Sequence, residues 1–328
     1  MIQTPFFLGS TKLPSNILCA PLAGCSDFPF RMMTSSYGPG LIYCEMTKMD
    51  ALVRNDAGTF RMLDFAESMH PIGAQICGSK PELAAPCAKI IEDLGFDVLD
   101  LNCGCPVDKV TKDGSGSALL KNPEKIGDIL ANMVAAVKIP VTVKIRIGWD
   151  ATEIIATKIT EIAEQAGAKA ICIHGRTRAQ GYTGPAKWGP IFDAKCVAKQ
   201  IKVIANGDIF DPLSAARAFA ETKADALLLA RGTMGQPWLA HDIRCYLETG
   251  VLPKRTSEDF RHALSLHIEH LLAYQHEQKA LCDLRRITPW YLRGCVGAKH
   301  VRESVNHAAT LTEALEHIRL FTWEEVLT

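Results

Sequence analysis

The stretch VLDLNCGCPVDKV, residues Val98–Val110, predicts a buried strand that ends in a turn rich in functional side chains. Its apolar first half is followed by a carboxamide, Asn102, and by two thiols, Cys103 and Cys105. Proline disfavours helical backbone at the residue before it, so Cys105 is expected on a loop. In α/β barrels and open sheets, ligands bind at the carboxyl ends of the strands. Cys105 is therefore a candidate acid or nucleophile.

Short apolar runs like this one recur at similar intervals along the chain. Eight of them are predicted as strands, at residues 16–20, 41–46, 72–77, 98–102, 141–147, 170–174, 203–206 and 226–230. Amphipathic segments such as 81–94, 123–137 and 153–166 lie between them and predict helices. Apolar strands that alternate with helices indicate a parallel sheet covered by helices, and eight such units favour a (β/α)8 TIM barrel over a doubly wound sheet.

Every predicted strand carries polar or glycine-rich residues at or near its end. In chain order these groups are Pro21–Gly24, Glu45, Gln75, Asn102 with Cys105, Lys144 with Arg146, His174 with Arg176, Asn206–Asp208, and Arg231–Gly232. A barrel enzyme assembles its site from the ends of several strands, so this pattern is what such an enzyme requires. A purely structural barrel has no reason to repeat polar side chains there.

The composition is that of an ordinary globular protein that is longer than one barrel. The 328 residues fit a barrel of roughly 250 residues and a smaller domain. The net charge is zero, so nucleic-acid binding would depend on a local patch.

Twelve scattered cysteines favour a reducing compartment. The N-terminus MIQTPFFLGS does not resemble a signal sequence, and no stretch approaches the ~20 apolar residues of a membrane span. We therefore expect a soluble, cytoplasmic protein.

Residues 245–328 are expected to form a helical domain that follows a catalytic barrel of residues 1–244. The alternation of strands and helices stops near residue 246, and helical patterns follow at 257–278, 281–292 and 311–320. Six lysines and arginines against one aspartate give residues 279–302 a net charge of +5, with Trp290 and Tyr291 among them. Such a stretch fits an RNA-contacting surface and fits a solvated helix face about equally well.

Two glycine-containing turns, Asn206–Asp208 and Ala230–Gly232, follow the seventh and eighth predicted strands. Barrels often bind a ligand phosphate at this place through backbone N–H groups. Gly207 would allow close approach of the backbone, and Arg231 could bind phosphate oxygens through two hydrogen bonds. The alternative is a pair of ordinary turns with a solvated arginine.

Lys144 lies inside an apolar strand, where its charge requires a partner. That partner would be an anionic cofactor ring, or Asp100 or Glu45 in a plain ion pair. His174 precedes the donor-rich turn Gly175–Arg178, so it either contacts a ligand or has only a structural role.

Cys103 and Cys105 form a C-x-C pair. No cysteine or histidine pair at a matching spacing accompanies them, so we expect no metal site. Redox pairs normally use the C-x-x-C spacing, which favours a catalytic thiol. An unperturbed thiol titrates near ~8.5 and can act as a general acid at neutral pH.

Together these motifs resemble the tRNA-dihydrouridine synthases, particularly the bacterial B-type branch. The resemblance covers nearly the whole chain, and its most specific part is the N-x-G-C-P loop. The matching segments are APLAGCSD (Ala20–Asp27), AQICG (Ala74–Gly78), DLNCGCPVDKV (Asp100–Val110), GSGSALL (Gly114–Leu120), VKIRIG (Val143–Gly148), IHGRT (Ile173–Thr177), ANGDI (Ala205–Ile209), ARG (Ala230–Gly232) and LRRITPWYLRG (Leu284–Gly294). Two positions depart from it: Ala230 stands where glycine is frequent, and Ile287 stands where histidine is common.

The resemblance implies a barrel that binds FMN tightly, takes electrons from NADPH, and reduces the C5–C6 bond of particular uridines in tRNA. Carried over by position, the cofactor-binding residues are Pro21, Leu22, Ala23, Gln75, Lys144, His174, Asn206, Gly207, Asp208, Ala230 and Arg231, the last five of them at the phosphate. Asn102 and Arg176, together with His174, would face the flipped uracil. Cys105 would donate the proton and Cys103 would be a bystander. The helical domain would bind tRNA, and the protein would be a monomer or weakly associated.

Two other functions fit part of the pattern. An FMN barrel that acts on a free small molecule, as dihydroorotate dehydrogenases do, would explain the lysine and the thiol but would leave residues 245–328 without a role. An RNA-binding module on a catalytically inactive barrel would leave the polar strand ends unexplained.

Overall fold

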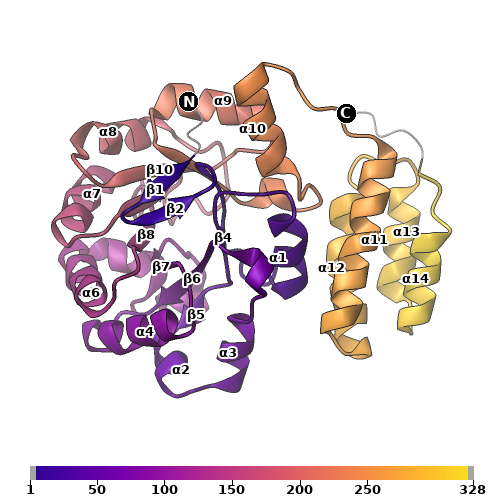
Figure 1. The fold of residues 1–328 in the computed structure, drawn as a ribbon, viewed down its shortest axis with the longest axis horizontal. Coiled ribbons are helices and arrows are strands. Elements are labelled where there is room, and N and C mark those ends of the chain that lie inside the picture. Colours follow the sequence, from indigo (N-terminus) through magenta and orange to yellow (C-terminus); the bar gives the residue numbers. More distant parts are fainter. Residues whose placement is uncertain (1–4, 324–328) are drawn as a thin grey trace.

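The computed structural model describes residues 5–323, and its centre is a closed barrel of eight parallel strands (Figure 1). In order around the barrel the strands are β3 (Ile17–Cys19), β4 (Ile42–Tyr43), β6 (Ile72–Cys77), β7 (Val98–Cys103), β8 (Val141–Arg146), β9 (Ala170–His174), β10 (Lys202–Asn206) and β11 (Ala226–Leu229). Pairing of β11 with β3 closes the ring, and the short β5 (Thr47–Lys48) adds to the edge of β6. Each of the eight apolar runs forms one barrel strand, so the predicted (β/α)8 fold is confirmed.

A hairpin that the sequence pattern did not predict covers the end of the barrel where the strands begin. It consists of β1 (Phe6–Leu8) and β2 (Thr11–Leu13), which pair antiparallel. The side chains of Phe6, Leu8 and Leu13 are buried in a cluster with residues from the strand starts, including Val98 and Ala170. The polar strand-end residues lie at the other end, where the parallel strands finish.

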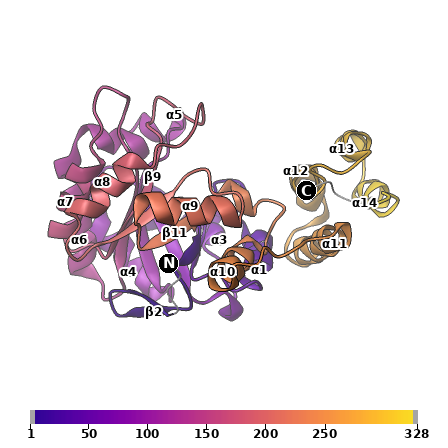
Figure 2. The same cartoon turned by 90° about the horizontal axis from the view of Figure 1, so that it is seen from above.

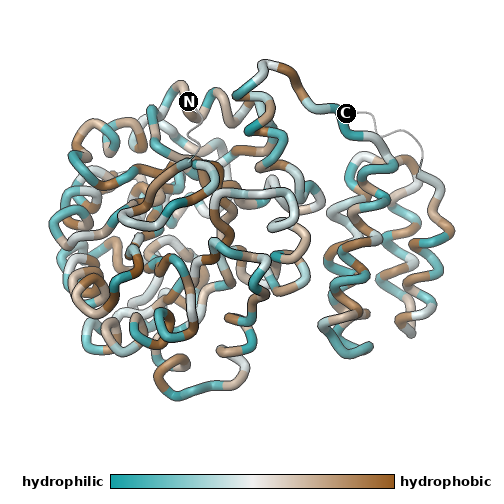
Figure 3. The backbone as a smooth tube through the Cα atoms, viewed as in Figure 1, coloured by the Kyte–Doolittle hydropathy of each residue, from teal (hydrophilic) through white to brown (hydrophobic). Residues whose placement is uncertain are grey.

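Helices surround the barrel and bury their apolar faces against the strands (Figure 2). The longer ones are α1 (Phe28–Ser35), α4 (Pro81–Asp93), α6 (Pro123–Ala136), α7 (Ala156–Gln165), α8 (Gly189–Val197), α9 (Pro212–Thr222) and α10 (Leu239–Thr249). The shorter ones in the connections are α2 (Met49–Val53), α3 (Ala57–Met62), α5 (Asp108–Thr111) and the 3-10 turns η1 (Glu67–Met69), η2 (Gly116–Lys121) and η3 (Arg231–Thr233). In α6 the buried Ile126, Ile129, Leu130 and Met133 recur at helical spacing. Figure 3 shows the resulting alternation of hydrophobic and hydrophilic stretches along the outer helices.

Four helices form a bundle beside the barrel (Figure 1): α11 (Ser257–Tyr274), α12 (Glu277–Tyr291), α13 (Ala298–His307) and α14 (Leu311–Arg319). The single helix expected at 257–278 is broken, because the backbone turns extended at Gln275 and the His276 side chain caps the start of α12. Helix α13 was not predicted from the sequence. It is short and buries few apolar side chains, of which Val301 and Val305 are the largest.

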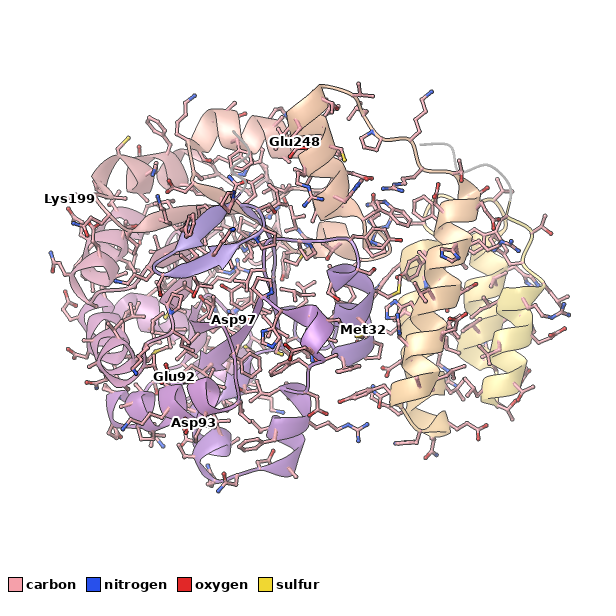
Figure 4. All side chains as sticks on the ribbon, viewed as in Figure 1. Met32, Glu92, Asp93, Asp97, Lys199 and Glu248 are labelled. Atoms are coloured by element: carbon pink, nitrogen blue, oxygen red, sulfur yellow. The ribbon has the colours of Figure 1, made fainter. Side chains whose placement is uncertain are left out.

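The bundle and the barrel share a hydrophobic core. Phe30 and Met33 of α1, and Trp238 just before α10, pack with apolar side chains of the bundle. Figure 4 shows side chains between the two parts and labels Met32 on the same helix α1. The boundary expected after residue 244 falls inside α10, whose Ile243 is buried in the barrel core. The division into 1–244 and 245–328 stays a prediction, and residues 1–4 and 324–328 lie outside the described part. Among the described residues, no helix is long and apolar enough to cross a membrane.

Candidate active site

A cavity of about 410 Å³ opens at the carboxyl ends of the barrel strands. This is a typical size for a small-molecule or cofactor site. It is lined by all of the predicted site residues except one: Pro21, Leu22, Ala23, Gln75, Asn102, Cys105, Lys144, His174, Asn206, Gly207, Asp208, Ala230 and Arg231. The exception is Arg176. The structure therefore brings together side chains that are up to 210 positions apart in the sequence because their strands are parallel neighbours.

The loop after β7 presents Cys105 to this cavity and hides Cys103. The Asn102 side-chain oxygen accepts hydrogen bonds from the backbone N–H groups of Gly104 (3.1 Å) and Cys105 (2.9 Å), which fixes the turn. Cys105 is half-buried and lines the cavity, whereas Cys103 is fully buried in the core between strands and helices. Burial also holds the pKa of the Cys103 thiol well above its usual value. Of the two thiols, only Cys105 faces the site.

A chain of hydrogen bonds runs from the barrel interior to the Cys105 loop. The Thr142 hydroxyl donates to Asp100 (2.6 Å), the Gln75 amide donates to the other Asp100 oxygen (2.7 Å), and the Asn102 amide donates to Gln75 (2.7 Å). Asp100 is buried, and desolvation raises the pKa of its carboxyl group to about 6 despite the two donors. Because Asp100 only accepts when ionised, it orients the Gln75 amide, and Gln75 in turn orients Asn102. The sequence pattern did not indicate this role of Asp100.

Lys144 enters the cavity from the middle of β8. Its ammonium group donates to the Asn206 side-chain oxygen (3.1 Å), and burial lowers the pKa of the ammonium. Within the described residues it forms no ion pair with Asp100 or with Glu45, so the plain ion-pair alternative is wrong. Asp100 acts on Lys144 through its charge without a direct ion pair, so a cation lies beside the cavity, an environment suited to an anionic ligand.

The turn after β10 has the geometry of an anion-binding loop. Gly207 has a φ of +117°, and a Cβ atom there would come within 2.9 Å of both the His174 ring and Ala186. Among the described residues, no protein group accepts a hydrogen bond from the backbone N–H of Gly207 or Asp208. Such N–H groups in a glycine turn beside a strand end are available to phosphate oxygens.

Two arginines hold Asp208 from either side. Burial acts to raise the pKa of Asp208, but hydrogen bonding and charge from Arg176 lower it on balance. Arg176 binds Asp208 at 2.7 Å and the Gly184 carbonyl at 2.6 Å, and its side chain is buried. Arg176 was expected to face the substrate, but it does not line the cavity, and its hydrogen bonds go to Asp208 and to the Gly184 carbonyl. Arg231 lies 3.5 Å from Asp208 and stays more exposed.

His174 lines the cavity as a neutral imidazole. Burial, with the nearby charges of Lys144, Arg146 and other arginines, lowers its pKa to about 2. The Arg176 guanidinium lies 3.3 Å from Nε2 of the ring, and a guanidinium only donates, so Nε2 accepts and Nδ1 carries the proton. The neutral ring can therefore offer one N–H donor.

Sequence reasoning gave no role to Arg146 and did not single out Tyr182. Arg146 is buried at the end of β8 and donates to the carbonyls of Gly104 (3.0 Å), Thr177 (2.8 Å) and Gly181 (2.8 Å), which joins the Cys105 loop to the loop after β9. Tyr182 is 59% exposed at the cavity, with the Arg231 guanidinium 4.4 Å from its ring centroid. The position of Tyr182 in a glycine-rich loop after a strand could have indicated that it lines the cavity.

The basic stretch of the bundle is not a surface of arginines and stacking aromatics. Trp290 and Tyr291 are 8% and 2% exposed and belong to the bundle core, as does Ile287. The sequence left open whether these aromatics form an RNA-contacting surface, and their burial contradicts that alternative at Trp290 and Tyr291. Arg286 is paired with carboxylates, while Arg293 is exposed.

Among residues 5–323, no group of three or more His, Cys, Asp or Glu side chains is placed to hold a metal ion.

Solved structures with this barrel include reductases and dehydrogenases. Morphinone reductase in complex with tetrahydroNAD aligns with a TM-score of 0.53 and 15% identity, covering 78% of this chain and 93% of that one. Histamine dehydrogenase from Rhizobium sp. 4-9 aligns with a TM-score of 0.57 and 14% identity, over 81% of this chain and 50% of that one. At this level of identity the likeness concerns the fold alone.

The sequence comparisons are more specific. A family model described as dihydrouridine synthase matches residues 18–326. The tRNA-dihydrouridine synthase B of Xanthomonas axonopodis pv. citri is 37% identical over 92% of this chain and 91% of its own length. The probable tRNA-dihydrouridine synthase of Rickettsia bellii is 37% identical over 91% of this chain and 92% of its own length. Since the family model spans nearly the whole chain and the relatives match about nine tenths of both chains, this chain belongs to the dihydrouridine synthase family.

Proposed function

We propose that this protein reduces the C5–C6 double bond of specific uridines in tRNA to give 5,6-dihydrouridine, with bound FMN as redox cofactor and NADPH as reductant. The relatives are named for this activity on tRNA. The observation that carries the proposal is the joint lining of one cavity by the half-buried Cys105 thiol, the Lys144 ammonium and the Gly207 turn.

The residues present fit an FMN molecule. Its phosphate would bind the free backbone N–H groups of Gly207 and Asp208, with Ala230 and Arg231 completing that end. Lys144 would stand beside the isoalloxazine ring, where a positive charge stabilises the anionic reduced state. The rest of the ring would contact Pro21–Ala23 and Gln75, which line the same cavity.

Bound FMN supplies the hydride that C6 of uracil receives. The uridine must first be unstacked and turned out of the folded tRNA, because a base in a stack cannot reach the cavity. Cys105 is the general acid in this proposal: its thiol proton passes to C5 as negative charge develops on the ring. Asn102 holds the loop of Cys105 through its side-chain oxygen, and the neutral His174 offers an N–H donor at the cavity.

The helical region 245–328 is proposed as the part that grips tRNA. Barrel strands supply the cavity, and the bundle stands beside the barrel (Figure 2), from where it would restrict which uridine reaches the site. The proposal places the enzyme in the cytoplasm, where tRNA is modified, as a monomer or weakly associated protein. It needs no metal.

The test measures dihydrouridine in tRNA incubated with the purified flavoprotein and NADPH. Cys105→Ala should retain flavin and tRNA binding and lose most of the reduction, whereas Cys103→Ala should stay active because its sulfur lies in the core. Equal activity of Cys105→Ala and wild type would refute the acid assignment.

Substrate identity is tested separately, with the full-length protein. Dihydrouridine absent from particular positions of tRNA in cells that lack this protein would identify its substrate. Turnover of dihydroorotate by the full-length protein, without activity on tRNA, would replace the proposed function by the small-molecule alternative.

A further inference from the structure

One arginine of the bundle reaches across to the loop that lines the cavity. Arg286 of α12 donates to the Asp27 carboxylate at 2.6 Å and to the Cys25 carbonyl at 3.4 Å. Both acceptors belong to the loop after β3, whose Pro21, Leu22 and Ala23 line the cavity together with Cys25. The contact joins residues 259 and 261 positions apart.

Other hydrogen bonds also anchor this loop, among them one from the Arg31 guanidinium to the Ser26 carbonyl. Asp27 caps the start of α1 by accepting from the backbone N–H of Phe30 (3.1 Å). On the barrel side, Glu45 accepts from the backbone N–H of Gly24. Ser26 accepts from the backbone N–H of Leu22 (2.8 Å). Arg286 therefore adds a hold on the segment between the cavity-lining residues and the helix.

Two neighbouring side chains on α12 orient the guanidinium of Arg286. Asp283, one helical turn earlier, binds it at 3.2 Å, and the Trp290 ring lies 5.2 Å from its centre. The side chains of Arg286 and Asp27 are 25% and 16% exposed, so this ion pair is shielded from solvent far more than a surface pair. A pre-oriented guanidinium that forms charge-assisted hydrogen bonds restrains its partner better than a flexible ammonium would.

We propose that Arg286 is a positioning residue for the cofactor cavity: from the helical bundle it fixes the loop Pro21–Asp27 in the shape that contacts the flavin ring. This inference rests on the proposed function, because the ligand of the cavity is FMN. It gives part of the basic stretch a role other than RNA contact. The bundle is then needed to shape the flavin site as well as to bind tRNA.

The experiment measures FMN affinity and the visible absorption spectrum of the bound flavin in full-length variants. Arg286→Gln should weaken FMN binding by about tenfold, the scale of one lost charge-assisted hydrogen bond, and should shift the flavin absorption bands. Arg286→Lys should recover part of the affinity. Asp27→Asn keeps a residue that caps helices well and removes only the charge pair, so it should weaken FMN binding similarly. The double variant should be no weaker than either single one.

Arg285→Gln is the matched control. Arg285 precedes Arg286 on α12 but bonds the Ala308 carbonyl inside the bundle (2.9 Å), so FMN affinity and spectrum should not change. Circular dichroism reports whether each variant is folded. A folded Arg286→Gln with wild-type affinity and spectrum would overturn the inference, and if that variant does not fold, Asp27→Asn with wild-type affinity does so. A wild-type protein that binds no FMN would instead overturn the proposed function.

Discussion

Replacing Asp100 by asparagine should stabilise the folded protein at neutral pH, and the gain should shrink as the pH falls. Asp100 lies inside the barrel, 3% exposed, and accepts from Thr142 and Gln75. Asparagine has nearly the same shape, and it can still accept from Gln75 and donate to the Thr142 hydroxyl. The change removes the ionisable group and preserves the chain of hydrogen bonds that leads to Asn102.

The magnitude follows from the pKa of this carboxyl group. Desolvation raises it from an ordinary 3.8 to about 6 in the folded protein. An acid with a raised folded pKa loses stability as the pH rises from its unfolded pKa to its folded pKa, because the unfolded chain releases its proton first. A shift of this size corresponds to a loss of about 3 kcal/mol at most, and about 1 kcal/mol of it develops between pH 5 and pH 7.

The assay is urea unfolding of the flavin-loaded wild type and Asp100→Asn protein at several pH values between 5 and 8, followed by tryptophan fluorescence. The difference in unfolding free energy should move in favour of the variant by about 1 kcal/mol from pH 5 to pH 7. Asp128→Asn, which changes an exposed carboxylate on α6, should show no such trend. A difference between wild type and Asp100→Asn that stays constant over this pH range would refute the assignment of a raised pKa to Asp100.

Two further predictions concern the ligands. Gly207→Ala should weaken FMN binding by at least about tenfold, because its φ is +117° and the added Cβ meets the His174 ring at 2.9 Å; unchanged affinity in a titration with free FMN would contradict the phosphate site. The affinity for tRNA should fall steeply between about 50 and 200 mM salt despite the zero net charge of the chain. A filter-binding series checks this, and a flat response would exclude a local basic contact.

The barrel could be predicted from the sequence because parallel strands are buried on both faces. Such strands read as unbroken apolar runs, as in Ile72–Cys77, and their polar ends then mark one side of the barrel. The β1–β2 hairpin gave no comparable signal, since each of its strands has three residues and β1 has an exposed residue between two buried ones. Segments of three residues are too short for an alternating or continuous apolar pattern to predict a strand.

The sequence could predict which residues belong to the candidate site, but not where each side chain points. Thirteen of the fourteen expected residues line the cavity because motif position fixes their place at strand ends. Arg176 instead binds Asp208, which lies 32 positions away, and no local sequence pattern indicates that contact. Trp290 and Tyr291 lie in an amphipathic helix whose buried face depends on the helices packed against it, so the sequence alone left their exposure open. Roles at the flavin and the uracil stay predictions.

The hydrophobic core that α1 shares with the bundle limits how this protein can be recombined. Phe30 and Met33 lie near residue 30, yet they pack with residues beyond 260. A chimera could exchange only the C-terminal helices with a relative, in order to change which uridine is modified. The packing surface of its new helices would then not match the surface of α1. The exchangeable unit comprises the four C-terminal helices together with α1 and the Asp27 cap before it. The choice of uridine is therefore expected to depend on α1 as well as on the four C-terminal helices, although these segments lie far apart in the sequence.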